Sequence, residues 1–159
     1  MSDAGPLQPG TPAPEFTLKR EDGSDFTRAD LLGQTTLLVF YPFAFSPVCT
    51  DQLNLYEEML EEFGARGATL YAVSCDATYS QTAFRDKLGV TIEQLSDFEP
   101  KGAVCRAFGV YHPGGFPQRA LVIVGPDATV KWSYQAPSPR DLPGANLIFD
   151  GLDQLAART

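Results

Sequence analysis

The residue with the clearest capacity for chemistry in this sequence is Cys49, which stands directly after Ser46-Pro47-Val48. Serine is a preferred N-cap and proline is favoured at the first helical position, so the pattern predicts a helix that begins at Pro47. Cys49 is then the third residue of that helix, where backbone N–H groups have no partner within the helix and the helix dipole is positive. We therefore expect this thiol to ionise more readily than an ordinary one.

The helix alone does not supply enough energy to make such a thiol reactive. A free cysteine is about 3% thiolate at pH 7, and making it mostly thiolate requires roughly 3.4 kcal/mol. A helix N-terminus contributes about 0.3–2 kcal/mol, and Asp51 acts in the wrong direction. A cation is needed, and arginine is best suited because it keeps its charge. Ionisation accelerates reaction only about 30-fold, so fixed hydrogen-bond donors around the sulfur are expected too.

The other two cysteines, Cys75 and Cys105, form neither a CxxC pair with each other nor a zinc-binding spacing. Buried cysteine is common and usually inert, so a structural role is the simpler interpretation of each. The single histidine, His112, lies among prolines and glycines and is interpreted as a loop residue. We expect no metal and no cofactor.

The elements around Cys49 follow from the apolar pattern. Thr36–Tyr41 is a short apolar run typical of a buried strand, and Pro42 ends it because proline has no N–H for the sheet. The helix that starts at Pro47 is predicted to run to about Gly64, with its four glutamates in solvent. A second apolar run, Ala68–Cys75, predicts a strand parallel to the first, because a helix connects the two.

The rest of the chain predicts a β-hairpin before this unit and a helix, a β-hairpin and a final helix after it. Their order indicates an α/β, thioredoxin-like fold with an N-terminal β-hairpin extension and a central mixed sheet flanked by helices. We expect one domain over residues 1–159, with residues 1–14 as an extended N-terminal arm. The segments are Glu15–Lys19 and Ser24–Thr27 (hairpin), Arg28–Gly33 (helical turn), Thr78–Leu88 (helix, with Ala83, Phe84 and Leu88 inward), Gln94–Ser96 (strand), Pro100–Phe108 (helix), Tyr111–Pro117 (loop), Ala120–Val124 and Thr129–Tyr134 (hairpin), and Leu147–Ala157 (helix).

Composition excludes several classes of function. The 159 residues carry a formal net charge of −8, which argues against nucleic acid or an anionic membrane as a partner. No run of about 18 apolar residues is present, and the first residues lack the pattern of a signal peptide. The odd number of cysteines, 3, suits a reducing compartment. We expect a cytoplasmic protein.

The segment Pro42-Phe-Ala-Phe-Ser46-Pro-Val-Cys49 resembles the Pro-x-x-x-Thr/Ser-x-x-Cys signature of peroxiredoxins, the alkyl hydroperoxide reductase/thiol-specific antioxidant family. The resemblance covers about residues 8–156 and is most similar to the alkyl hydroperoxide reductase E group. Its further motifs are Val73-Ser-Cys-Asp76, Leu95-Ser-Asp97, Phe98-Glu-Pro-Lys-Gly-Ala-Val104, Phe108-Gly-Val-Tyr111, and Arg119 at the start of a strand.

The resemblance implies a peroxidase that reduces hydrogen peroxide and organic hydroperoxides. Cys49 would be the peroxidatic cysteine, which becomes a sulfenic acid. Ser46 would hydrogen-bond the peroxide, Pro42 would shield the sulfur from water, and Arg119 would be the cation that holds the thiolate. The family often has Glu where this chain has Gln52, and an amide can hydrogen-bond Arg119 without neutralising it.

The sequence leaves two routes for the reduction of the Cys49 sulfenic acid. The sulfenic acid is reduced either by an external thiol, such as thioredoxin, a glutaredoxin- or mycoredoxin-like protein or a low-molecular-weight thiol, or by Cys75 or Cys105 as a resolving cysteine. The one-cysteine cycle is slightly favoured. The resemblance also implies a homodimer. Two other functions compete: a thioredoxin-like thiol–disulfide oxidoreductase, which the missing CxxC disfavours, and a non-catalytic thioredoxin-like binding module.

Overall fold

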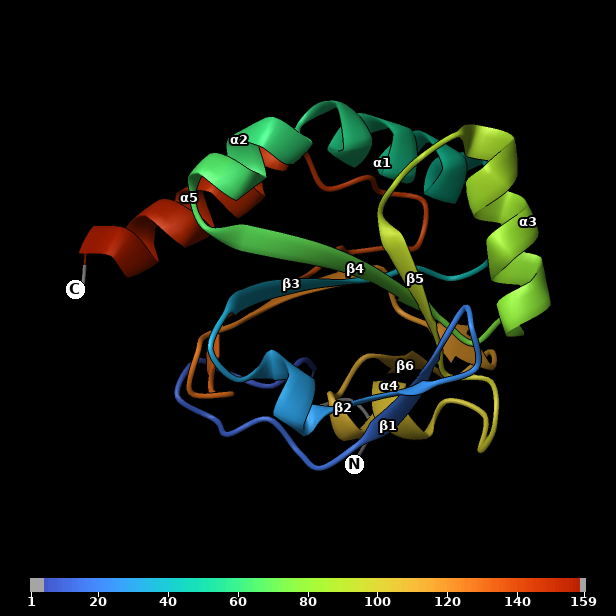
Figure 1. Cartoon of the computed structure of the whole chain (residues 1–159), viewed down its shortest axis with the longest axis horizontal. Coiled ribbons are helices and arrows are strands. Elements are labelled where there is room, and N and C mark those ends of the chain that lie inside the picture. Colours follow the sequence, from blue (N-terminus) through green and yellow to red (C-terminus); the bar gives the residue numbers. More distant parts are fainter. Residues whose placement is uncertain (1–4, 158–159) are drawn as a thin grey trace.

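A seven-stranded mixed sheet forms the centre of the structure, a computed structural model that describes residues 5–157 (Figure 1). The strand order is β2-β1-β5-β4-β3-β8-β9, and a separate two-stranded sheet pairs β6 with β7. The strands are β1 (Thr17–Arg20), β2 (Asp25–Thr27), β3 (Thr35–Phe40), β4 (Ala68–Ser74), β5 (Glu93–Ser96), β6 (Tyr111–His112), β7 (Phe116–Pro117), β8 (Ala120–Val124) and β9 (Val130–Gln135). The helices are η2 (Arg28–Leu31, a 3-10 helix), α1 (Pro47–Glu58), α2 (Leu60–Ala65), α3 (Thr78–Leu88), α4 (Ala103–Ala107) and α5 (Ala145–Ala157). This is the α/β fold that the sequence predicts.

β3 and β4 pair in parallel, as the helical connection between them requires. On its other side, β3 is antiparallel to β8. All five residues from Leu37 to Tyr41 are fully buried, which explains the uninterrupted apolar run in this part of the sequence. The sheet therefore brings the ends of β3 and β4 to one edge, together with the start of β8.

Helices cover both faces of the sheet (Figure 1). On one face α1, α2 and α5 enclose an apolar cluster that contains Leu37, Val39 and Leu152. On the other face α4 and the N-terminal segment enclose a second cluster, which contains Leu38, Phe40 and Phe108. Alternate residues of β3 thus point into different clusters, as the period of a strand requires.

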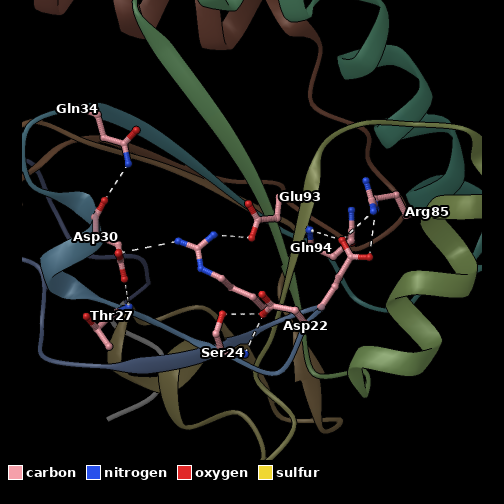
Figure 2. Close-up of polar contacts among 10 residues, drawn as sticks. Asp22, Ser24, Thr27, Asp30, Gln34, Arg85, Glu93 and Gln94 are labelled. Atoms are coloured by element: carbon pink, nitrogen blue, oxygen red, sulfur yellow. Dashed lines mark hydrogen bonds and ion pairs between the residues drawn. The ribbon is translucent and has the colours of Figure 1, made fainter.

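The N-terminal hairpin is an integral part of the central sheet, because β1 pairs antiparallel with β5. Polar contacts hold it there (Figure 2). Arg20 donates to the Glu93 carboxylate at 2.6 Å. In the hairpin turn, the Asp22 carboxylate accepts the backbone N–H of Ser24 at 2.9 Å and the hydroxyl of the same residue at 2.6 Å.

The predicted helix from Pro47 to Gly64 is two helices, and this part of the prediction is wrong. Met59 leaves the helical conformation at φ −104° and ψ 8°, and its N–H bonds the Tyr56 carbonyl at 3.0 Å. After the break Phe63 is fully buried and packs on the ring of Phe149 with centroids 5.0 Å apart. The apolar spacing continues across Met59, so the sequence pattern conceals the break.

Two side chains of this layer have roles other than those predicted. Glu57 is not simply solvated, because its carboxylate accepts the N–H of Thr91 at 2.9 Å and the hydroxyl of the same residue at 2.7 Å. Ala83 is exposed. Gln81, and not Ala83, is on the buried side of α3. Gln81 is fully buried and donates to the Leu95 carbonyl at 2.8 Å.

The remaining predictions differ from the structure mainly at boundaries. The loop from Tyr111 to Pro117 contains the short β6–β7 pair, and α4 is shorter than the helix expected from Pro100. Of the predicted N-terminal arm, residues 5–14 form no helix and touch the sheet through a bridge between Pro12 and Thr129; residues 1–4 lie outside the described residues. Within residues 5–157, no helix is long and apolar enough to cross a membrane.

Candidate active site

Cys49 is the third residue of α1, which begins at Pro47 as the sequence predicts. The N–H of Thr50 bonds the Ser46 carbonyl at 2.9 Å and so closes the first turn around the cysteine. The side chain of Cys49 is fully buried, in the apolar cluster that contains Leu53 and Tyr56. A sulfur in this place is protected from bulk water and lies at the positive end of the helix.

The sheet brings Arg119 to this sulfur from 70 positions away in the chain. Ala120 opens β8 and pairs with Phe40, the last residue of β3, so Arg119 lies beside the segment that leads into α1. Its side chain is 2% exposed, and its Nη2 donates to Cys49 Sγ at 3.2 Å. The guanidinium of Arg119 is therefore in direct contact with the Cys49 sulfur.

Two further bonds fix the orientation of the guanidinium. Nε of Arg119 donates to the Pro139 carbonyl at 2.7 Å, and Nη1 donates to Gln52 Oε1 at 2.6 Å. Gln52 is itself fully buried and donates to the Tyr56 hydroxyl at 3.3 Å. That hydroxyl donates to the Pro143 carbonyl at 2.7 Å. The Pro-rich loop before α5 and one face of α1 thus hold the arginine from two sides.

Besides the Cys49 sulfur, the Arg119 guanidinium bonds only uncharged groups among residues 5–157. The partners of the Arg119 guanidinium are an amide oxygen, a backbone carbonyl and the Cys49 sulfur. Burial raises the pKa of Tyr56 to about 12, so its hydroxyl is neutral at pH 7. At an effective dielectric constant of about 20, a guanidinium in contact with a thiolate gains roughly 5 kcal/mol of attraction. The guanidinium is therefore placed where it would stabilise negative charge on the Cys49 sulfur.

The other two predicted site residues, Ser46 and Pro42, lie in the loop before α1 and form no hydrogen bond to the Cys49 sulfur. Ser46 is the N-cap of α1 by position, but its side chain makes no capping bond; its hydroxyl donates to the Phe43 carbonyl at 2.9 Å. Pro42 is buried at the end of β3 and lines a cavity of about 340 Å³ that also contains Cys75. The sulfur of Cys49 and the guanidinium of Arg119 are therefore brought together directly, whereas Ser46 and Pro42 belong to the loop that frames them.

A carboxylate outside the predicted site holds that loop in place. Asp76 Oδ2 accepts the N–H of Ala44 at 2.8 Å and the hydroxyl of Ser74 at 2.8 Å. The loop also contains a non-glycine residue with positive φ, Phe45 at 71°. Such a conformation costs about 1–2 kcal/mol, so the loop leading into α1 is under strain.

Cys75 and Cys105, which the sequence treats separately, lie together with Asp97. One ligand atom of each residue lies within 4.8 Å of the others, and all three side chains are buried. The Asp97 carboxylate accepts the N–H of Val104 at 3.1 Å and that of Cys105 at 2.8 Å, so it caps α4. Burial raises the pKa of the Cys105 thiol and that of Asp97. The donor set has the chemistry of a metal site, but both carboxylate oxygens already bind backbone N–H groups.

The family resemblance points to Gln52 as a hydrogen-bond partner of Arg119, as the structure has it, but Tyr56 and the two loop carbonyls are not predicted. Tyr56 lies four residues after Gln52 on the same helix, so the helical period could have placed the two together. No signal in the sequence indicates that the carbonyls of Pro139 and Pro143 close the site. That contact depends on the path of a loop with no regular structure.

Comparison with known proteins identifies the family and the fold of this chain. Residues 9–133 match the AhpC/TSA family. A Mycobacterium tuberculosis relative classed with the peroxiredoxins is 36% identical over 111 residues, which are 70% of this chain and 69% of that protein. The alkyl hydroperoxide reductase E of Mycobacterium bovis is 29% identical over 153 residues, which are 95% of this chain and 99% of that protein. The crystal structure of Enterococcus faecalis AhpC has a TM-score of 0.85 at 24% identity and covers 96% of each chain.

Proposed function

Because the chain belongs to the AhpC/TSA family of cysteine-dependent peroxidases, we propose that Cys49 is the cysteine at which it reduces its peroxide substrate. The observation that carries this assignment is the 3.2 Å contact between Arg119 Nη2 and Cys49 Sγ. This contact is buried, and among residues 5–157 no carboxylate is a hydrogen-bond partner of the guanidinium. The substrate is a peroxide and the electrons come from a thiol.

In the first step the Cys49 thiolate attacks one oxygen of the peroxide. The S–O bond forms while the O–O bond breaks, and the second oxygen leaves as water or an alcohol after it takes up a proton. Negative charge moves from the sulfur to the leaving oxygen, so catalysis requires donors that face that oxygen. Nη2 of Arg119 has a second N–H besides the one on the sulfur, and it can bind the leaving oxygen. The product at Cys49 is a sulfenic acid.

Ser46 and Pro42 are proposed to shape the place where the peroxide binds. Ser46 lies one helical turn before Cys49, and its hydroxyl can exchange the Phe43 carbonyl for a peroxide oxygen by rotating. Pro42 has no N–H and is buried at the end of β3, so it keeps water from the sulfur without adding a competing donor. Gln52 is a positioning residue, since it acts on the sulfur only through Arg119.

Several broader properties belong to the same proposal. The enzyme takes electrons from an external thiol, which is a thioredoxin, a glutaredoxin- or mycoredoxin-like protein or a low-molecular-weight thiol. A cytoplasmic location is supported by three cysteines that are all free thiols. A single domain is supported by one sheet that contains strands from Thr17 to Gln135. The homodimer follows from the family resemblance, and sedimentation of the purified protein tests it.

The assignment is tested by peroxide consumption in the presence of dithiothreitol. The wild-type protein is expected to remove hydrogen peroxide catalytically, and the Cys49→Ser variant is expected to be inactive while remaining folded by circular dichroism. The matched variants Cys75→Ala and Cys105→Ala are expected to keep the first oxidation step. Full activity in Cys49→Ser would contradict the assignment, and so would loss of the first step in either control.

A further inference from the structure

The thiols of Cys75 and Cys105 form a pair that the proposed first step does not use. Their sulfur atoms lie within 4.8 Å of each other, and both side chains are buried. A disulfide has an S–S distance of about 2.05 Å, so the two sulfurs need to approach by less than about 3 Å to bond. Cys75 directly follows β4 and Cys105 lies within α4, so a disulfide would join segments that are already packed together.

Packing alone accounts for Asp97 but not for the two thiols. The carboxylate of Asp97 caps α4 through the N–H groups of Val104 and Cys105. A pair of adjacent thiols, in contrast, contributes nothing to this cluster that two small apolar side chains would not. Adjacent thiols do have one property that apolar residues lack, which is the ability to give up two electrons together as a disulfide.

One of the two thiols can be reached from the surface. Cys75 lines the cavity of about 340 Å³ whose wall includes Pro42 and Phe43 of the loop before α1. It is 9% exposed, whereas Cys105 is fully buried behind it. Any exchange with another sulfur must therefore take place at Cys75, and Cys105 can react only with the Cys75 sulfur. This arrangement imposes an order on the chemistry.

The cavity also lies beside the segment that carries Cys49. Cys49 and Cys75 follow β3 and β4, which are adjacent and parallel, so both lie at the same edge of the sheet. They pack into apolar clusters on opposite faces, and the two sulfurs can meet only if the first turn of α1 opens. Two features lower the cost of opening that turn. Phe45 before it has a φ of 71°, and the side chain of Ser46 makes no capping bond to the helix. Unwinding breaks the backbone bond from Thr50 to the Ser46 carbonyl but no side-chain capping bond.

We propose that Cys75 and Cys105 act together as a resolving dithiol, which reduces the Cys49 sulfenic acid and ends as an intramolecular Cys75–Cys105 disulfide. This rests on the proposed function, which supplies the sulfenic acid. First, Cys75 Sγ attacks the Cys49 sulfur; the new S–S bond forms, the S–O bond breaks, and hydroxide leaves with the Cys75 proton as water. Second, Cys105 Sγ attacks Cys75 Sγ and displaces Cys49 as a thiolate.

Protons and electrons balance in this sequence. The Asp97 carboxylate, which has an oxygen within 4.8 Å of the Cys105 sulfur, takes the proton when Cys105 attacks. Cys49 returns to the ion pair with Arg119 as a thiolate. The two electrons that reduced the peroxide now come from the dithiol, which is oxidised to the disulfide. An external thiol then returns two electrons and two protons by attacking at Cys75, the accessible sulfur.

The test is a disulfide map of the full chain after one equivalent of hydrogen peroxide. The reaction is quenched with N-ethylmaleimide, and the protein is digested without reduction and analysed by mass spectrometry. We expect a Cys75–Cys105 disulfide, with Cys49 alkylated as a recovered thiol. In Cys105→Ala a Cys49–Cys75 disulfide is expected to accumulate. In Cys75→Ala the sulfenic acid of Cys49 is expected to persist and to be trapped by dimedone.

The outcomes separate the two proposals. If Cys49 becomes a sulfenic acid in the wild type while Cys75 and Cys105 are both alkylated, the resolving dithiol is wrong and the peroxidase assignment stands. If Cys49 stays a thiol and no disulfide forms, the peroxidase assignment fails. The Cys49→Ser variant decides whether the dithiol depends on Cys49. Its Cys75–Cys105 disulfide should form at least about 30-fold more slowly, and equal rates would overturn the proposal.

Discussion

Replacement of Arg119 by methionine removes the charge at the site while keeping much of the side-chain length. The guanidinium is bonded to Cys49 Sγ, Gln52 Oε1 and the Pro139 carbonyl, and it is 2% exposed. Methionine fills the same space and donates no hydrogen bond. The sulfur of Cys49 then has only the helix N-terminus to stabilise its charge.

Two separate reductions in the rate of Cys49 oxidation are expected in Arg119→Met, and their sizes differ. Without the cation, the thiolate fraction at pH 7 falls to a few per cent, which slows the attack on peroxide by up to about 30-fold. Loss of a donor to the leaving oxygen slows it by a further 10²–10³-fold, by analogy with removing one oxyanion-hole donor. The second-order rate constant for hydrogen peroxide should therefore fall by roughly 10³–10⁴-fold at pH 7.

The pH of the assay distinguishes the two losses. Rapid quench with N-ethylmaleimide, followed by intact mass, gives the rate of oxidation at pH 7 and at about pH 9.5, where a free thiol is mostly ionised. Raising the pH should restore about 30-fold in Arg119→Met and leave a deficit of at least about 10²-fold against wild type. Arg140→Met, an exposed arginine in the same Pro-rich loop, is the matched control and should behave as wild type.

Two results would refute this reasoning. If Arg119→Met reacts within about 30-fold of wild type at pH 7, the arginine contributes nothing beyond ionisation. If the whole deficit disappears at about pH 9.5, the second N–H of Nη2 does not act on the leaving oxygen. Circular dichroism accompanies both assays, because the change leaves buried acceptors on Gln52 and Pro139 unpaired, each of which costs about 1–3 kcal/mol.

Other replacements test the surroundings of the site and one packing contact. Ser46→Ala should slow oxidation about 10-fold, the value of one hydrogen bond, whereas Ser46→Thr should stay near wild type; equal rates for both would exclude a role for the hydroxyl. Gln52→Leu should slow oxidation about 3–10-fold, because the Arg119 guanidinium loses one of the bonds that orient it. An unchanged rate would show that the bond to the Pro139 carbonyl is enough to orient Arg119. Gly151→Ala should lower stability to urea by about 1–3 kcal/mol, because the added methyl would lie 2.8 Å from the Trp132 ring; a gain of about 1 kcal/mol, as helix propensity alone suggests, would contradict this. Burial raises the pKa of the Cys105 thiol, so its thiolate is scarcer than in free cysteine at pH 7; its alkylation by N-ethylmaleimide should be the slowest of the three cysteines and should accelerate as the pH rises.

Local rules predict most of the elements that lead to the site. Proline after serine fixes the start of α1 at Pro47, and the apolar run before Pro42 identifies β3 almost to the residue. The same rules fail where a tertiary contact overrides them. Met59 leaves the helix although the apolar spacing continues, and Gly151 interrupts a helical pattern because Trp132 needs the space of its missing side chain.

The site is predicted less completely, because its parts come from distant segments. A reactive thiolate at Cys49 requires a nearby cation, but only the family resemblance selects Arg119 among the arginines. The sheet register explains the contact afterwards, since Ala120 pairs with Phe40 at the end of β3. The pairing of Cys75 with Cys105 has no signal in the sequence, because it depends on how α4 packs against the end of β4.

The most direct test of the central claim is the rate at which Cys49 is oxidised by equimolar hydrogen peroxide, measured by stopped flow against free cysteine in the same buffer. Ionisation alone makes a thiol about 30-fold faster than free cysteine at pH 7. If the ion pair with Arg119 also stabilises the leaving oxygen, the rate constant should exceed that of free cysteine by at least about 10³-fold. A rate no more than about 30-fold above free cysteine would contradict the account.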